Sequence, residues 1–147
     1  MIQFCTFGHQ TGDKHPDAMR LKNLSLPYGA RIYKALSDES RIRIINLLHH
    51  HRELCISDLE QVLDFTQTKT SRHLSFLRNA GIVNARKSEQ WVFYSIKEEV
   101  HDILAQTLGY LSKDQTLARD IETFDIMYSN RELAAFRHAH VPAASER

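Results

Sequence analysis

Apolar residues recur every three or four positions along most of the chain from residue 28 onward. This spacing places them on one side of a helix, so it predicts a series of amphipathic helices. The predicted helices cover about residues 28 to 36, 38 to 49, 57 to 63 and 67 to 79. Residues 1 to 27 show no sustained period and contain glycines and prolines among polar residues, which is typical of an arm with little structure.

Polar capping residues mark the boundaries of these helices. Ser37 and Asp38 precede the second helix, and residues 57 to 60 read Ser-Asp-Leu-Glu, which matches a capping box at the start of the third. Gly81 follows the fourth helix, where a C-terminal cap is expected. Only residues 64 to 66 separate the third helix from the fourth, so the pair is predicted to form a helix-turn-helix.

Beyond Gly81 the apolar residues alternate with polar ones instead of following helical spacing. Residues 82 to 87 and 91 to 96 are both strand-like and lie close together, which predicts a β-hairpin, the wing of a winged helix. Helical spacing returns over about residues 98 to 128, and a second capping box at 129 to 132 predicts a short terminal helix. We therefore expect a mainly α winged helix-turn-helix protein with a small β-hairpin wing, which is dimeric through its N- and C-terminal helices at about 28 to 36 and 98 to 128, because their apolar stripes exceed what one small core needs.

Composition agrees with a globular chain that buries a core. The 147 residues are 42% hydrophobic and 25% charged. No run of about 18 apolar residues and no basic and apolar leader is present, so we expect a cytoplasmic protein without a membrane span. The predicted organisation is a flexible arm over residues 1–27, a winged helix-turn-helix domain over 28–112 and a C-terminal helical extension with a tail over 113–147.

Charge is distributed unevenly, although the net charge is only +1. No acidic residue occurs between residues 65 and 88, and the cations of this sector are Lys69, Arg72, Arg78, Arg86 and Lys87. A run of charge alone is usually a solvated face. Here the helix-turn-helix, the wing and the basic sector follow one another in the order that a DNA-binding module requires, so the pattern favours a nucleic-acid partner.

The fourth helix carries the strongest functional signal. At 100° per residue, Leu74 and Leu77 fall on one side, whereas Thr68 and Arg72 fall on the other with small polar residues. Such a face can enter a major groove about 12 Å wide, and the helix N-terminus can hold a phosphate. The predicted DNA contacts are Thr66, Gln67, Thr68, Lys69, Ser71, Arg72 and His73 on this helix and Arg86, Lys87 and Gln90 on the wing.

Several blocks of residues 35 to 96 resemble the ArsR/SmtB family of winged-helix repressors. The blocks are ALSDESRIRIINLL, ELCISDL, TQTKTSRHLSFLRNAGIV and WVFYSI, and the resemblance extends over roughly residues 28 to 112. It implies a homodimeric transcriptional repressor that binds an inverted-repeat operator in double-stranded DNA and leaves it when a metal, metalloid or oxidant binds. Thr70 departs from the family, which usually has Val or Ile there; its hydroxyl can bond back to the helix.

The block ELCISDL also raises the question of an effector site. Metalloid-sensing family members have Cys-x-Cys at this position, whereas this chain has Cys55 followed by Ser57. One thiolate does not make a tight site for As(III) or a soft divalent metal, so the second sulfur would have to come from Cys5. Three interpretations stay open: a shared metal site of Cys5 and Cys55, a redox or alkylation role for the pair, and a Cys55 that is only packed in the core.

Other chemistry is less well supported by the sequence. Glu99 and His101 resemble part of a second family metal site, but they are one residue out of register and lack distal imidazoles. The run His49 to His51 is best explained as the end of the second helix. No Gly-rich phosphate loop and no orienting partner for a Cys-His pair are evident, so we expect a protein that is not an enzyme.

Overall fold

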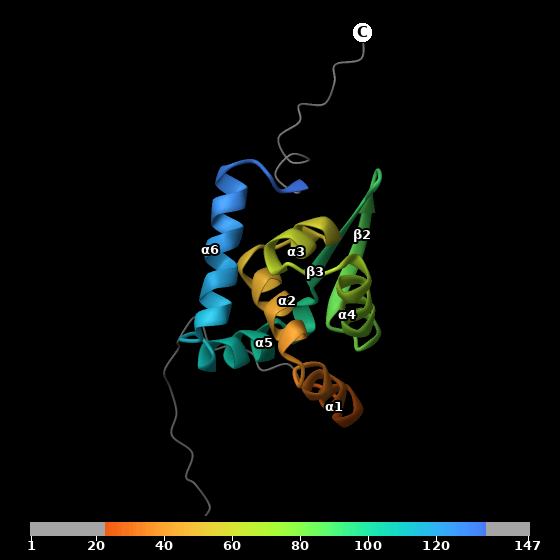
Figure 1. Ribbon diagram of the computed structural model, residues 1–147. Coiled ribbons are helices and arrows are strands. Elements are labelled where there is room, and N and C mark those ends of the chain that lie inside the picture. The colour runs from red at the N-terminus through yellow and green to blue at the C-terminus, as the bar shows by residue number, and fades with distance from the viewer. Residues whose placement is uncertain (1–22, 135–147) are drawn as a thin grey trace, which may run out of the picture.

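The computed structural model describes residues 23–134 and is drawn in Figure 1. Within that range the chain forms α1 (Leu26–Ala35), α2 (Glu39–His50), β1 (Leu54–Cys55), α3 (Ile56–Leu63), α4 (Gln67–Asn79), β2 (Val83–Ser88), β3 (Trp91–Ile96), α5 (Glu98–Tyr110) and α6 (Gln115–Ser129). The architecture is therefore mainly helical with one small sheet, as predicted. None of the described helices is long and apolar enough to cross a bilayer.

The helix-turn-helix consists of α3 and α4. Asp64 adopts a left-handed conformation with φ 54° and ends α3, and Thr66 then caps α4 by accepting a hydrogen bond from the Lys69 N–H. The fourth helix has the bounds that the sequence predicts. At its other end the Gly81 and Ile82 N–H groups donate to the carbonyls of Arg78 and Leu77, and Gly81 has φ 79°, so glycine supplies the expected C-terminal cap.

The sheet has three antiparallel strands in the order β1-β3-β2. The hairpin of β2 and β3 is the predicted wing, and Ser88 pairs with Trp91 at its tip. The sequence did not predict β1, which consists of two residues and pairs Cys55 with Phe93. This short strand joins the wing to the start of α3.

One apolar cluster lies between the helices and the sheet, and its fully buried members include Ile44, Leu59, Leu74, Ile82 and Leu104. Helix α6 lies alongside α2 and α3, away from the wing (Figure 1). Arg43 of α2 donates two hydrogen bonds of 2.8 Å to the carboxylate of Asp120 on α6. This pair fixes α6 to the centre of the domain.

Three predicted boundaries differ from the structure. Helix α3 begins at Ile56 with Cys55 in the cap position, so the Ser57 capping box is wrong; strand pairing keeps the backbone extended up to Cys55, and the helix starts directly after it. Ser129 is the last residue of α6, so it does not cap a following helix. Helix α1 begins at Leu26 after a Ser25 cap, slightly before the predicted end of the arm, because Pro27 suits the first turn of a helix.

Candidate nucleic-acid interface

The outer face of α4 is exposed and free of acidic side chains. Its exposed residues are Gln67, Thr68, Ser71, Arg72, Ser75, Arg78 and Asn79, and Thr66 is exposed at the cap. The Thr66 hydroxyl already satisfies one N–H of the first turn, and the remaining free N–H groups carry the positive end of the helix dipole. This face combines small side chains with cations, as a helix that enters a major groove requires.

The inner face of α4 is buried against the core. Leu74 and Leu77 are fully buried, and so is Thr70. The Thr70 hydroxyl donates a 2.9 Å hydrogen bond to the Thr66 carbonyl, which is the back-bond expected from the sequence. A threonine is therefore accommodated at this apolar position without an unsatisfied hydroxyl.

His73 does not belong to the exposed face, although the sequence pattern predicts it among the DNA contacts. Its side chain is only 7% exposed. Burial lowers the pKa of His73, while the nearby Asp38 carboxylate raises it. The reason is geometric: His73 follows Arg72 by one step of about 100°, which carries it toward the inner side of the helix.

Arg41 fixes the position of α4 relative to α1 and α2. Its guanidinium lies 4.1 Å from the centre of the Phe76 ring on α4, and its Nε donates a 2.7 Å hydrogen bond to the Ala35 carbonyl at the end of α1. Just beyond the C-terminal end of α4 the Tyr28 hydroxyl donates to the Gly81 carbonyl. The sequence did not reveal these supports, because they join residues that no local pattern relates.

Phe65, in the turn between α3 and α4, provides a second support. The ammonium group of Lys69 lies 3.8 Å from the centre of its ring, and the Arg43 guanidinium lies 5.1 Å from it. Lys69 is half-buried as a result. Its charge remains at the N-terminal end of α4, beside the proposed phosphate position.

The wing carries less free positive charge than its sequence indicates. Arg86 forms two hydrogen bonds of 2.8 Å with the Glu53 carboxylate, and this pair lowers the pKa of Glu53. Lys87 and Gln90 are exposed near the tip, together with the acidic Glu89. Lys87 is therefore the better candidate for a phosphate contact, because Arg86 must first leave Glu53.

Cys55 lies at the junction of β1 and α3. It is 1% exposed, and its sulfur is 3.1 Å from the Ser57 hydroxyl oxygen. Burial raises the pKa of the Cys55 thiol, and the Ser57 hydrogen bond opposes that change only in part. The thiol form is thus favoured at neutral pH. Cys5 lies outside the described residues, so its predicted partnership with Cys55 stays a prediction.

The histidine run ends α2 as predicted, with His51 in the cap position. The rings of His49 and His101 lie 5.2 Å apart, and His51 stacks on Phe124 with a centroid separation of 3.4 Å. Burial lowers the pKa of both His49 and His51. Across residues 23–134, no group of three or more His, Cys, Asp or Glu side chains is arranged to hold a metal ion.

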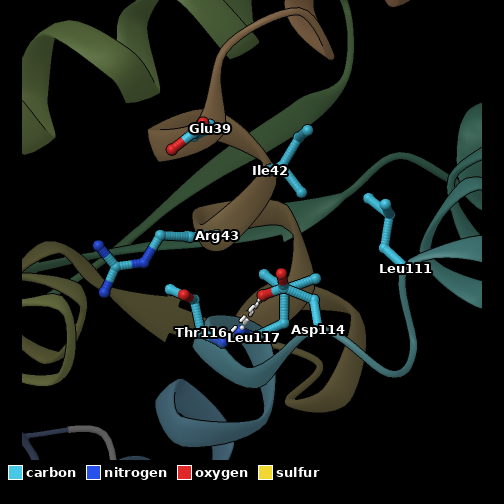
Figure 2. Close-up of a pocket in the computed structure, with 7 residues that line it drawn as sticks. All are labelled: Glu39, Ile42, Arg43, Leu111, Asp114, Thr116 and Leu117. Atoms are coloured by element: carbon cyan, nitrogen blue, oxygen red, sulfur yellow. Dashed lines mark hydrogen bonds between the residues drawn. The ribbon is translucent and has the colours of Figure 1, made fainter.

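A separate cavity of about 390 Å³ lies between α2 and the turn from α5 to α6. Figure 2 shows its lining residues: Glu39, Ile42, Arg43, Leu111, Asp114, Thr116 and Leu117. The Asp114 carboxylate accepts hydrogen bonds from the N–H groups of Thr116 and Leu117, so it serves to cap α6. With two carboxylates in its wall, this cavity is unsuited to a phosphate group.

A cationic helix presented by a helix-turn-helix, with a hairpin directly behind it, defines a winged-helix DNA-binding protein. Residues 38–85 match the family model described as bacterial regulatory protein, arsR family. The chain is 34% identical over 99 residues to the cadmium resistance transcriptional regulatory protein CadC of Listeria innocua. The match covers 67% of this chain and 82% of that protein. The chain belongs to the arsR family of transcriptional regulators.

Other relatives agree with this assignment. The arsenical resistance operon repressor of Escherichia coli K12 is 41% identical over 70 residues, or 48% of this chain and 60% of that protein. The structure of reduced HlyU from Vibrio cholerae is similar with a TM-score of 0.52 and 32% sequence identity. The match covers 60% of this chain and 90% of the HlyU chain. The homodimeric winged helix-turn-helix domain of Mb0332 from Mycobacterium bovis has a TM-score of 0.55 at 27% identity, over 60% and 82% of the two chains.

Proposed function

We propose that this protein is a repressor that binds an inverted-repeat operator as a homodimer and blocks transcription by occupying a promoter. The observation that carries the proposal is the exposed face of α4, where Arg72 projects among small polar residues without a nearby acidic side chain on the same helix. Arg72 would read base edges, and the N-terminal turn from Thr66 to Lys69 would hold a phosphate. Ser71, Lys87 and Gln90 complete the proposed contacts.

Exposed apolar side chains on α1 and α5 support the homodimer. Leu26 is 86% exposed, Tyr33 64% and Tyr110 92%, although they lie on helices that otherwise pack on the core. Where such side chains from α1 and α5 form one continuous patch, that patch is suited to association with a second subunit. The Mb0332 domain, which shares the fold, is described as homodimeric. In this proposal residues 28–112 form the DNA-binding domain, and residues 113–147 form its extension.

The decisive experiment measures binding to an operator selected from random-sequence duplexes. Arg72→Ala is expected to abolish specific binding while the circular dichroism spectrum and the melting temperature stay unchanged. Arg119→Ala is the matched control, because Arg119 is an exposed arginine on α6. Binding by the parent protein should also weaken steeply between about 50 and 200 mM salt. Unchanged affinity of Arg72→Ala would refute the assignment of α4 as the reading helix.

A thiol-directed effector is the proposed signal for release. The names of relatives refer to cadmium and arsenical resistance. Among residues 23–134 the only cysteine is Cys55, and one buried thiol does not fit a soft metal that needs two or three thiolates. A metal site would therefore require Cys5 from the same or the second subunit. The alternative is a regulator without a metal site that responds to redox change or acts constitutively, and the burial of Cys55 favours constitutive action because a buried thiol is inert.

The effector proposal is tested by release of bound operator. As(III), Cd(II), Zn(II), a persulfide and a peroxide are added separately to the complex. Release by As(III) or Cd(II) that disappears in both Cys5→Ser and Cys55→Ser supports a shared thiolate site. Release by persulfide or peroxide alone supports a redox role. If none of the five reagents releases DNA, the thiol-directed proposal is wrong, and the protein responds to another signal or acts constitutively.

A further inference from the structure

The chain reverses direction after α6 and returns to the domain. The Glu132 and Arg131 N–H groups donate hydrogen bonds of 2.9 and 3.0 Å to the carbonyls of Met127 and Tyr128. Arg131 has φ 58°, the left-handed conformation that normally favours glycine. This turn directs the following residues away from the α6 axis and back over α3. Residues 131–134 are called the cover segment here.

The end of the cover segment is fixed to α3 by a buried hydrogen bond. The Ala134 N–H donates to the Asp58 carboxylate over 2.7 Å. Asp58 is 1% exposed, and Leu133 is fully buried in the main apolar cluster. A buried carboxylate must be hydrogen-bonded to be tolerated, so the attachment is specific rather than a loose surface contact.

The same segment lies against the thiol. Ala134 forms a small buried cluster with Cys55 and Phe93, and Trp91 of the wing packs on its edge. Cys55 therefore has β3 on one side and Ala134 on another. Asp58, which fixes Ala134, is three residues further along in the first turn of α3.

From these contacts we propose that the cover segment controls access to Cys55: while Ala134 is bound to Asp58 the thiol is closed, and detachment of residues 131–134 opens it. A reagent or ligand larger than a proton reaches the sulfur only after detachment. By linkage, whatever occupies Cys55 must also favour the detached segment. The control of access stands on the contacts alone, whereas its role in regulation rests on the proposed function.

Alkylation of Cys55 by N-ethylmaleimide tests the proposal. The thiolate sulfur bonds to one alkene carbon, the other carbon takes a proton from water, and the thiol proton goes to water. The background variant is Cys5→Ser, so that Cys55 is the single thiol, and the rate is followed by intact-protein mass spectrometry. When the segment opens and closes rapidly, the rate follows the population of the open form.

Two variants change the attachment of the segment in opposite directions while Cys55 itself is kept. Ala134→Pro removes the N–H that Asp58 accepts, and alkylation is expected to accelerate at least tenfold. Arg131→Gly removes the cost of the left-handed backbone, and alkylation is expected to slow about fivefold. The matched control is Arg119→Gly on the exposed side of α6; it lowers helix propensity without altering the turn, so its rate should remain within twofold of the parent.

The alkylation rates of the two variants, read together with their melting temperatures, decide whether the proposal holds. Acceleration in Ala134→Pro and slowing in Arg131→Gly, at melting temperatures close to that of the parent, support the proposal. Rates within twofold of the parent in both variants would overturn it. If Ala134→Pro fails to fold, Arg131→Gly alone decides. Operator affinity measured in parallel separates the two proposals, because a parent protein that binds no operator contradicts the proposed function and leaves the alkylation result intact.

Discussion

The attachment of α6 to α2 through Asp120 offers a sharp test of what stabilises the domain. Asp120→Ala removes the two 2.8 Å hydrogen bonds from Arg43 and leaves that guanidinium beside the Phe65 ring without its carboxylate. The side chain of Asp120 is 5% exposed and that of Arg43 is 26% exposed. The pair is thus largely buried, and the arginine is the more exposed of the two side chains.

The expected loss of stability follows from this difference in exposure between the two side chains. Removing one partner of a fully buried ion pair costs about 3 to 5 kcal/mol, because the other charge stays buried without compensation. Arg43 can regain part of its hydration, so we expect Asp120→Ala to lower the free energy of unfolding by about 2 to 3 kcal/mol. Asp120→Asn keeps one acceptor and should cost about 1 kcal/mol less than the alanine change.

Urea unfolding followed by circular dichroism measures these values, at one fixed protein concentration because association affects apparent stability. Glu122→Ala on the same helix is the control; its side chain is exposed, and the expected change is below about 0.5 kcal/mol. A double-mutant cycle with Arg43→Ala should give a coupling energy of about 2 kcal/mol. A coupling energy near zero would refute the argument, whatever the single variants show.

Three further predictions concern the turn after α4, the histidines and the wing. Gly81→Ala is expected to lower the free energy of unfolding by about 1 to 2 kcal/mol, because φ is 79° and the new Cβ would lie 3.0 Å from the Tyr28 ring; an unchanged urea midpoint would contradict this. Burial lowers the pKa of His49 and His51 from 6.5 in the folded state, so the unfolded chain binds more protons just below that pH. Stability should therefore fall as pH decreases from about 7 toward 5.5 in thermal melts, and a flat profile there would be inconsistent with neutral buried imidazoles. Lys87→Ala should weaken binding to operator and to unrelated DNA alike and reduce the salt slope of the dimer by about 2, one phosphate contact for each subunit; a loss confined to the operator would argue against a phosphate contact.

The sequence predicted those elements whose boundaries are local. Helix α4 has the bounds that apolar spacing, the Thr66 cap and Gly81 indicate, because each signal lies within the element or next to it. The wing follows equally well from alternation. The capping box at Ser57 failed because a competing interaction is distant in sequence: β1 pairs with β3, and this pairing decides where α3 starts.

In the candidate site, too, local features could be predicted from the sequence, whereas contacts between distant residues could not. Periodicity correctly placed Arg72 outward and Leu74 inward, but a residue at the edge of a helical face, such as His73, is decided by what packs there. The ion pair of Arg86 with Glu53 joins residues 33 positions apart, and a charge count along the chain could not anticipate it. Contacts of this kind change which cations are available to DNA without leaving a local signature.

The two-residue strand β1 has a mechanical consequence. Phe93 of β3 pairs with Cys55 of β1 on one side and with Arg86 of β2 on the other, so these three residues form one row across the sheet. A two-stranded hairpin is marginally stable by itself in water, whereas a third strand stiffens it. Whatever separates Cys55 from Phe93 therefore softens the wing, so the stiffness of this hairpin depends on residues that lie before α4 in the chain.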